Sequence, residues 1–275
     1  AAPTLAGLLE GDKGLAADYR REVYDKPSLG AILVQWNTTK GPLQDARVRR
    51  ALAMLFDRQV IVDKVLGGVG TVAAAFGKRG RAGYPADLEA MPFDPPAARR
   101  LLREAGFVPE DGKPLRVRLL VPAGVSWFRQ MGEMAAAAAR QAGVELQLQE
   151  LLGKELFDRI GGDDWDGALL LKNLTPDLDP YELFHSRGGL NVMHWNDSKV
   201  DELLDQQRTE RDENKRSAIL REVHLRVADQ QPVALLVHPL AEILVNAHLQ
   251  EAKPGPRGMW PERVWVPVEF QRAAP

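Results

Sequence analysis

The chain contains no cysteine among its 275 residues. Disulfides, zinc–thiolate sites, iron–sulfur clusters and thiol catalysis are therefore excluded. The sequence also lacks a run of about 18 apolar residues, so it predicts no transmembrane helix. A formal net charge of −2 provides no basic field, and we expect no nucleic acid to contact this chain. Apolar residues make up 45% of the sequence, which is enough for a sizeable core without metal or disulfide support.

Signals for export and for catalysis are also missing. Residues 1–14 lack the basic start and apolar stretch of a secretory signal, so we expect no signal in this chain. The histidines show no metal-ligand spacing, and no G-x-S-x-G elbow is present. Glycines 67, 68 and 70 lack the lysine and hydroxyl of a phosphate-binding loop. The sequence therefore predicts no catalytic residue, no metal ligand and no cofactor.

The clearest local signals lie in residues 45–68. Asp45 is placed to cap a helix with one apolar face. That face is predicted to hold Val48, Ala51, Leu52, Leu55 and Phe56. Asp57 can cap a second short helix that Gly67 or Gly68 ends. The neighbouring arginines are expected to make structural ion pairs or hydrogen bonds rather than touch a ligand: Arg47, Arg49, Arg50 and Arg58.

Strand and helix patterns alternate after residue 94. A helix is predicted at 94–106, where an Asp-Pro pair begins it and a glycine follows it. The later patterns predict strands at 115–121, 144–148 and 168–171, helices at 127–142 and 156–160, and further strands at 233–237 and 243–245. This order predicts an α/β layer with parallel neighbours and right-handed crossovers.

A polar segment, residues 172–180, follows the strand predicted at 168–171. Open α/β sheets tend to bind ligands at the carboxyl ends of their strands. Lys172, Asn173 and Asp177 are side chains that could fix the orientation of a small solute there. Asp179 precedes Pro180 in the manner of a helix cap, so we predict a structural role for Asp179.

Three segments resemble the family 5 extracellular solute-binding proteins, which are the dipeptide, oligopeptide and nickel receptors of ABC importers. Residues 37–68 follow the family pattern N-T-x-x-x-P-F-x-D-x-R-V-R-x-A-L-x-x-x-x-D-R-x-x-I-V-x-x-V-x-x-G, with leucine at the phenylalanine position. Residues 94–107 are similar to the family helix D-P-x-x-A-x-x-L-L-x-E-A-G-[WF]. Residues 179–204, with DPYELFHS and NVMHWNDSKVDELL, carry the third match.

This resemblance implies the fold and the domain organisation. It implies an α/β periplasmic-binding-protein-like lobe (type II, cluster C-like) with a mixed, mostly parallel sheet flanked by helices. Residues 1–28 are then expected to be a remnant leading from an absent first lobe, and residues 29–275 to form the C-terminal solute-binding lobe. Strands near 29–36 and 243–270 are expected to cross to the other lobe, and that lobe or a dimer partner would be needed to cover their apolar side.

The resemblance also implies where a ligand lies. In peptide-binding members a tryptophan and an aspartate come shortly before the Asp-Pro pair. Here Lys172 or Asn173 stands at the tryptophan position, and Asp177 is the nearest acid. A lysine at this place suits an acidic or polar ligand. Asn191 and Trp195 are expected to line the cleft, with ordinary packing as the equal alternative for Trp195.

The function implied is non-catalytic capture of a small peptide or other polar solute between two lobes. The expected partners are that ligand, an ABC permease in the membrane and the absent N-terminal lobe of the same protein. The expected location is periplasmic or extracellular, free or lipid-anchored. An alternative is a ligand-sensing lobe of a transcriptional regulator fused to a DNA-binding domain. A hydrolase would have to use the acidic pairs Asp163–Asp164 or Asp177/Asp179, and it predicts turnover of ester, peptide or glycoside substrates.

Overall fold

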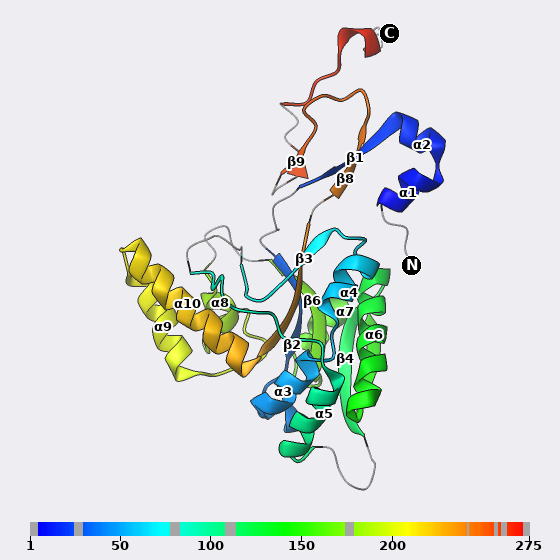
Figure 1. The fold of residues 1–275 in the computed structure, drawn as a ribbon. Helices are drawn as coiled ribbons and strands as arrows, with labels where there is room; N and C mark the ends of the chain where they lie inside the picture. The colour runs from blue at the N-terminus through cyan, green and yellow to red at the C-terminus, as the bar shows by residue number, and fades with distance from the viewer. Residues whose placement is uncertain are drawn as a thin grey trace.

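The chain folds around one six-stranded sheet, shown in Figure 1 as a computed structural model. The structure describes residues 5–24, 30–77, 83–107, 114–173, 179–240, 242–255, 258–259 and 263–271. In spatial order the strands are β3 (Gly70–Val72), β7 (Val233–Pro239), β2 (Gly30–Trp36), β6 (Gly167–Asn173), β4 (Leu115–Pro122) and β5 (Val144–Leu151).

Helices cover both faces of this sheet. The first face is covered by α3 (Ala46–Ala53), α4 (Arg58–Val60), the π-helical turn η2 (Ile61–Val65), α5 (Pro95–Glu104) and α6 (Ser126–Ala142). The second face is covered by α7 (Gly153–Ile160), α8 (Tyr181–Phe184), α9 (Ser198–Thr209) and α10 (Glu213–Gln230). Figure 1 shows α9 and α10 on one side of the sheet and α5 and α6 on the other.

The strand directions confirm the predicted mixed sheet. β4 pairs in parallel with β5 and β6, and the other three pairings are antiparallel. Consequently β4, β5, β6 and β7 run in one direction, while β2 and β3 run the opposite way. The carboxyl ends of four strands therefore meet along one edge of the sheet, which we call the carboxyl edge.

β2 lies inside the sheet, and all of its residues are buried. Ile32 and Val34 face the core under α6, whereas Ala31 and Leu33 face the core under α10. The expectation that this strand needs another lobe to cover its apolar side is therefore wrong. Helices of this chain cover both of its faces, as is usual for continuously apolar strands in the interior of an α/β sheet.

Local signals set the helix ends largely as the sequence predicts. Asp45 accepts a hydrogen bond from the amide of Arg47 at 2.8 Å, and Asp94 accepts one from the amide of Ala97 at 2.7 Å. Gly143 ends α6 with a φ of 81°, a left-handed conformation that favours glycine.

Two arginines in the 45–68 stretch are buried and bind only backbone carbonyls. Arg49 donates to the carbonyls of Leu43 at 2.7 Å and Gln230 at 2.7 Å. Arg58 donates to the carbonyl of Leu235 in β7 at 2.8 Å and to those of Ala53 and Phe56 at 3.1 Å. Burial lowers the pKa of each guanidinium to about 10, which leaves both charged at neutral pH. The structural role predicted for these arginines is confirmed.

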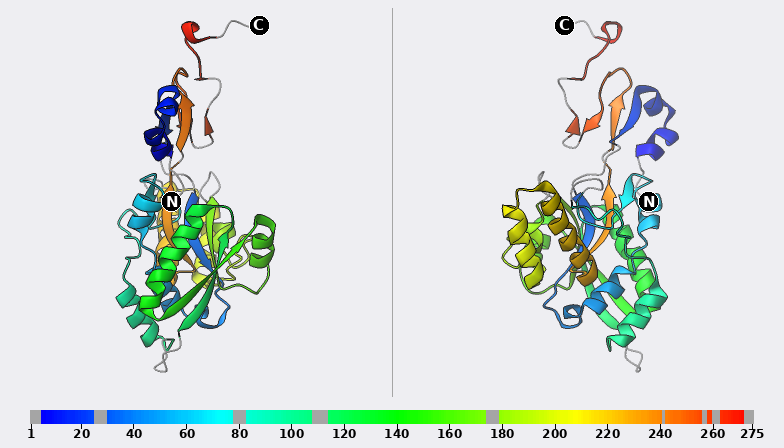
Figure 2. Two further views of the ribbon diagram at one scale, coloured as in Figure 1. Left: turned by 90° about the vertical axis from the view of Figure 1, so that its right-hand side faces the viewer. Right: turned by 60° about the vertical axis from the view of Figure 1, so that its left-hand side comes forward.

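A smaller unit projects beyond the carboxyl edge. In it β1 (Tyr19–Val23) pairs antiparallel with β8 (Glu242–Asn246), and α1 (Leu5–Gly11) and α2 (Lys13–Asp18) precede β1. Arg21 and Glu242 form an ion pair of 2.7 Å across this ladder. Both figures show the unit standing off the end of the sheet, with the C-terminal residues beyond it (Figures 1 and 2). No sequence pattern predicts β1, and the division of the chain at residue 28 stays a prediction.

We predict that Arg58→Met lowers the free energy of unfolding by about 3 kcal/mol, because it leaves three buried carbonyls without their donor. Arg103→Met on the exposed side of α5 is the matched control, with an expected change within about 0.5 kcal/mol. Urea unfolding followed by circular dichroism measures both. Equal losses in the two variants would contradict a structural role for Arg58.

Candidate functional site

The carboxyl edge gathers residues from separate parts of the chain. Here β6 ends at Leu171, Lys172 and Asn173, β7 ends at Pro239, and β2 begins at Gly30. The projecting β1–β8 ladder stands beyond this edge (Figure 1). Open α/β sheets bind ligands in the crevice outside the carboxyl ends of their strands, so this edge is the candidate site.

A cavity of about 290 Å³ opens at this edge on the α6 side of the sheet. Of its eleven described lining residues, nine are apolar, and the two polar ones are Gln130 and Glu242. The apolar wall includes Ile32, Val69, Trp127, Leu171, Pro239 and Leu240. These residues come from strands β2, β6 and β7, from helix α6, from the turn between η2 and β3, and from the loop that joins β7 to β8. A cavity of this size lies at the lower end of the range for small-molecule sites.

Lys172 lies on the opposite face of the same strand. Side chains alternate along β6, so Leu171 faces the cavity with Leu169, whereas Lys172 shares its face with Leu170. Lys172 is half-buried, and burial lowers the pKa of its ammonium below the ordinary value. In the part of the chain that the structure describes, no carboxylate forms an ion pair with it. Such a cation can attract an acidic or polar group.

Asn173 lies against the first residue of β2. A Cβ atom added at Gly30 would come within 2.2 Å of the Asn173 side-chain oxygen and 2.8 Å of the Lys172 carbonyl. The two strands thus approach too closely here for any residue but glycine. Lys172 and Asn173 are therefore brought together at the carboxyl edge, whereas Asp177 lies outside the described residues.

Asn191 and Trp195 lie together in the loop before α9. The Asn191 amide donates to the carbonyls of His185 at 3.1 Å and Trp195 at 2.8 Å, and its oxygen accepts from the Trp195 amide at 3.2 Å. Trp195 is 5% exposed and packs edge-on against Phe184, with ring centroids 6.2 Å apart. Both side chains contact the protein itself, and their observed role is to hold this loop in shape.

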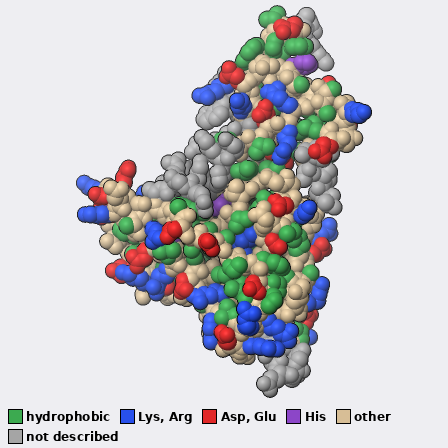
Figure 3. Space-filling view, viewed as in Figure 1, with side chains coloured by type: hydrophobic (Ala, Val, Ile, Leu, Met, Phe, Trp, Pro, Cys, Tyr) green, Lys and Arg blue, Asp and Glu red, His purple; other side chains and the backbone are tan. Residues whose placement is uncertain are grey.

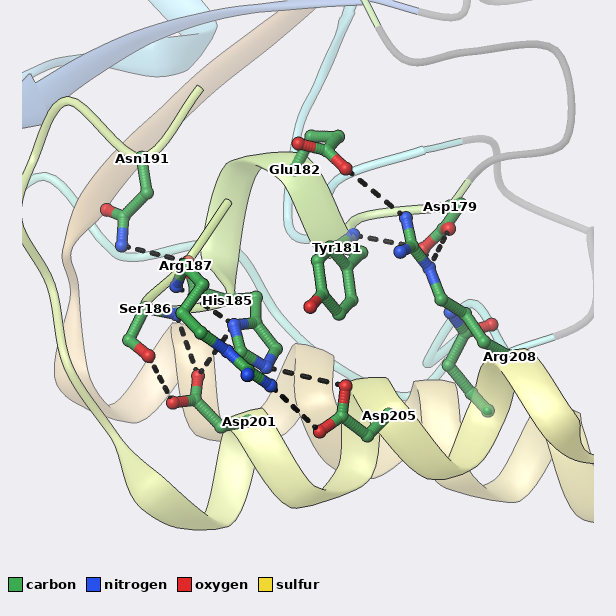
Figure 4. A network of polar contacts seen from close by, with 11 residues as sticks. Asp179, Tyr181, Glu182, His185, Ser186, Arg187, Asn191, Asp201, Asp205 and Arg208 are labelled. Atoms are coloured by element: carbon green, nitrogen blue, oxygen red, sulfur yellow. Dashed lines mark hydrogen bonds and ion pairs between the residues drawn. The ribbon is translucent and has the colours of Figure 1, made fainter. Parts of the chain in front are cut away.

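A polar network fixes α8 to α9, and no sequence pattern pointed to most of it (Figure 4). Asp179 accepts from the amide of Tyr181 at 3.0 Å and from Arg208 at 2.8 Å, which agrees with the structural role predicted for it. The Arg208 guanidinium lies 3.5 Å from the centre of the Tyr181 ring, and His185 stacks on Tyr181 at 4.2 Å. Asp179 and Arg208 lie 29 positions apart, so local reading could not pair them.

Positively charged side chains gather at the end of the molecule away from the carboxyl edge. In the space-filling view, Lys and Arg side chains cluster over the end of the molecule formed by α3 and α5, far from the projecting unit (Figure 3). Arg99, Arg100 and Arg103 of α5 are exposed. This basic end lies away from the carboxyl edge.

The histidines of the sheet and of α10 serve structural roles. His238 of β7 is buried, with its ring nitrogens 2.9 Å from the Gly30 carbonyl and 3.1 Å from the Ala75 carbonyl. His224 lies beside Tyr84, and burial lowers its pKa to about 4. Among the described residues, no group of three or more His, Asp or Glu side chains could hold a metal ion. No described helix is long and apolar enough to cross a membrane.

Solved structures with similar folds are receptors for solutes. The oligopeptide-binding protein AppA from Bacillus subtilis, solved with a nonapeptide, superimposes with a TM-score of 0.81 at 20% identity over 97% of this chain and 59% of AppA. The murein tripeptide binding protein MppA from Escherichia coli gives a TM-score of 0.78 at 24% identity over 95% of this chain and 51% of MppA. At these identities the likeness establishes the fold, a periplasmic-binding-protein-like lobe.

Sequence comparison gives the family. The family model described as bacterial extracellular solute-binding proteins, family 5 Middle, matches residues 4–190. MppA is 30% identical over 227 residues, covering 80% of this chain and 42% of MppA. Protein XP55 of Streptomyces lividans is 30% identical over 256 residues, covering 86% of this chain and 44% of XP55. The chain therefore belongs to the family 5 bacterial extracellular solute-binding proteins. It spans about half the length of the curated relatives it matches.

We predict that Asn191→Leu lowers the free energy of unfolding by about 2 kcal/mol, because it leaves two carbonyls and one amide in the loop without partners. Lys172→Met is expected to leave the stability unchanged or to raise it, because it removes a partly desolvated cation. Urea unfolding at pH 7 compares the two variants. A larger loss for Lys172→Met than for Asn191→Leu would contradict these assignments.

We also predict that the free energy of unfolding falls as the pH drops from 7 to 4. The pKa of His224 is lowered to about 4 in the folded chain, whereas it is about 6.5 in the unfolded chain. Between about pH 6.5 and pH 4 the unfolded chain therefore binds the proton more readily, and the free energy of unfolding decreases as the pH falls. His224→Asn should remove up to about 3 kcal/mol of this loss, which corresponds to the fall of its pKa from 6.5 to about 4 on folding. His248→Asn, at an exposed position, is the control and should leave the pH profile unchanged.

Proposed function

We propose that this chain is the C-terminal solute-binding lobe of a substrate-binding component of an ABC importer. The complete receptor captures a small peptide or other polar solute between two lobes and delivers it to the membrane permease in the periplasm or outside the cell. The names of the relatives support a peptide as ligand: AppA is an oligopeptide-binding protein and MppA a murein peptide-binding protein. The dipeptide-binding protein of Escherichia coli also matches, at 27% identity over 240 residues.

The observation that carries this proposal is the composition of the carboxyl edge. Three consecutive residues of β6 combine different properties there. Leu171 lines an apolar cavity, Lys172 is a half-buried cation, and Asn173 carries a side-chain amide. A few polar groups beside an apolar wall are typical of small-molecule sites. Among the described residues no catalytic constellation accompanies them, and capture rather than turnover is the proposed role.

The proposed ligand contacts follow from position. Lys172 and Asn173 face the ligand, and Asp177, which lies outside the described residues, is the third proposed contact. Asn191 and Trp195 act through the loop that they hold, close to α8 and α9. The cation at Lys172 favours a solute with a carboxylate or another acidic group.

The projecting unit supports the two-lobe part of the proposal. The chain leaves the main sheet after β7 and continues into β8, which pairs with β1 more than 200 residues earlier. Residues 5–24 and 242–271 are proposed to adjoin the remainder of the receptor, consistent with the expected crossing near 243–270. The division into residues 1–28 and 29–275 remains part of this proposal.

Native mass spectrometry of the full-length protein, purified without refolding, should detect a retained small solute. By contrast, calorimetry on this chain alone should detect at most weak binding of any released solute, because the contacts from the other lobe are missing. Lys172→Met in the full-length protein should weaken binding of an acidic solute about tenfold, the loss of one charge-assisted contact. Lys199→Met, at a partly exposed position on α9, is the control. Sub-micromolar affinity for the chain alone would contradict the two-lobe proposal.

A further inference from the structure

The size and the apolar wall of the cavity at the carboxyl edge indicate which chemical group it could bind, which the proposed function leaves open. Its volume is about 290 Å³, and nine of its eleven described lining residues are apolar. An apolar cavity of about 150 Å³ in a protein is known to accept benzene. The space here is therefore large enough for a bicyclic ring or a branched aliphatic group.

The described lining residues present no unmatched charge. The one acidic residue among them, Glu242, is ion-paired with Arg21 at 2.7 Å, and this pair also joins β8 to β1. Gln130 on α6 is the other polar lining residue, and no described group makes a hydrogen bond to its amide. A neutral group with a single hydrogen-bonding atom would match this wall better than a charged one, since burying an unpaired charge is costly.

The opening of the cavity lies beside the proposed ligand contacts. Leu171 is 43% exposed and is the most exposed of the lining residues. It immediately precedes Lys172 and Asn173 in β6. On the inner side, the indole of Trp127 packs on Phe128 with ring centroids 3.9 Å apart, so a fixed aromatic surface forms part of the wall.

We propose that this cavity is an apolar subsite that accepts a neutral aromatic or branched aliphatic group of the captured solute. The part concerning a captured solute rests on the proposed function. Asn173 shares the Leu171 face of β6, so a solute whose polar part spans the end of this strand, from Lys172 to Asn173, can place an apolar side group past Leu171 into the cavity. The preferred ligand class is thus a peptide or similar polar solute that carries one large apolar group.

The probe for the cavity is 5-fluoroindole, titrated into the 275-residue chain and followed by fluorine NMR. We expect binding with a Kd below about 1 mM. Leu171→Trp, which fills the opening, should weaken it at least tenfold, and Val65→Trp should do so from the opposite wall. Leu190→Trp is the matched control, since Leu190 is 52% exposed and does not line the cavity. It should leave the Kd within twofold.

Two further readouts keep the test independent of how well a variant folds. In the unmodified chain, nuclear Overhauser effects should join the probe to methyl groups of Leu171 and Val69. The charged analogue 5-fluoroindole-2-carboxylate should bind at least tenfold more weakly. Absence of 5-fluoroindole binding, or equal binding by the carboxylate, would overturn the subsite. Because the probe needs neither permease nor second lobe, its binding would stand even if the full-length protein retained no solute. A retained solute without an apolar group would instead refute the ligand class.

Discussion

The arrangement of this lobe depends on how β7 is held where it passes the middle of the sheet. The pairing of β7 with β2 shifts register between Ile32 and Leu33, so Leu235 and Val237 pair with neighbouring residues of β2. A bulge of this kind bends a strand and increases its twist. Arg58 donates to the carbonyl of Leu235 at this point, from the helix that follows the 45–56 segment. The guanidinium thus supplies a donor where the ladder is irregular, and the strand continues toward β8 from a fixed position.

Much of the fold could be predicted because its signals are local. Aspartates before helices, glycine after α6 and alternating apolar residues in β4 and β5 each act within a few positions of the chain. The predicted helix at 127–142 and strand at 144–148 correspond to Ser126–Ala142 and Val144–Leu151. β1 was missed because Tyr19–Val23 has no alternation, and its partner β8 lies over 200 residues away. β2 was found but its surroundings were misjudged, since coverage of a strand depends on distant helices.

The candidate site could be predicted only in part, for the same reason. Lys172 and Asn173 were found because they follow a recognisable buried strand. The cavity was not, because its walls come from α1, β2, η2, α6, β6 and the β7–β8 connection, which share no sequence signal. Asn191 and Trp195 were assigned to the cleft by resemblance, whereas their contacts are those of a loop scaffold. A family motif identifies residues that matter, but it does not distinguish a ligand contact from the support of a loop.

The alternation of β6 has a consequence for how receptors of this kind can change. Leu171 and Lys172 point to opposite faces of one strand, and Gly30 and Gly167 fix that strand at its two ends. At Gly167 an added Cβ would lie 2.6 Å from the Trp36 ring, so neither end can slide. A shift of one residue would carry the lysine to the cavity side and the leucine to the other. In the proposed site, the alternation of β6 therefore decides which side chain reaches the cavity. A substitution there changes one side chain, whereas a single insertion within β6 would exchange the two faces.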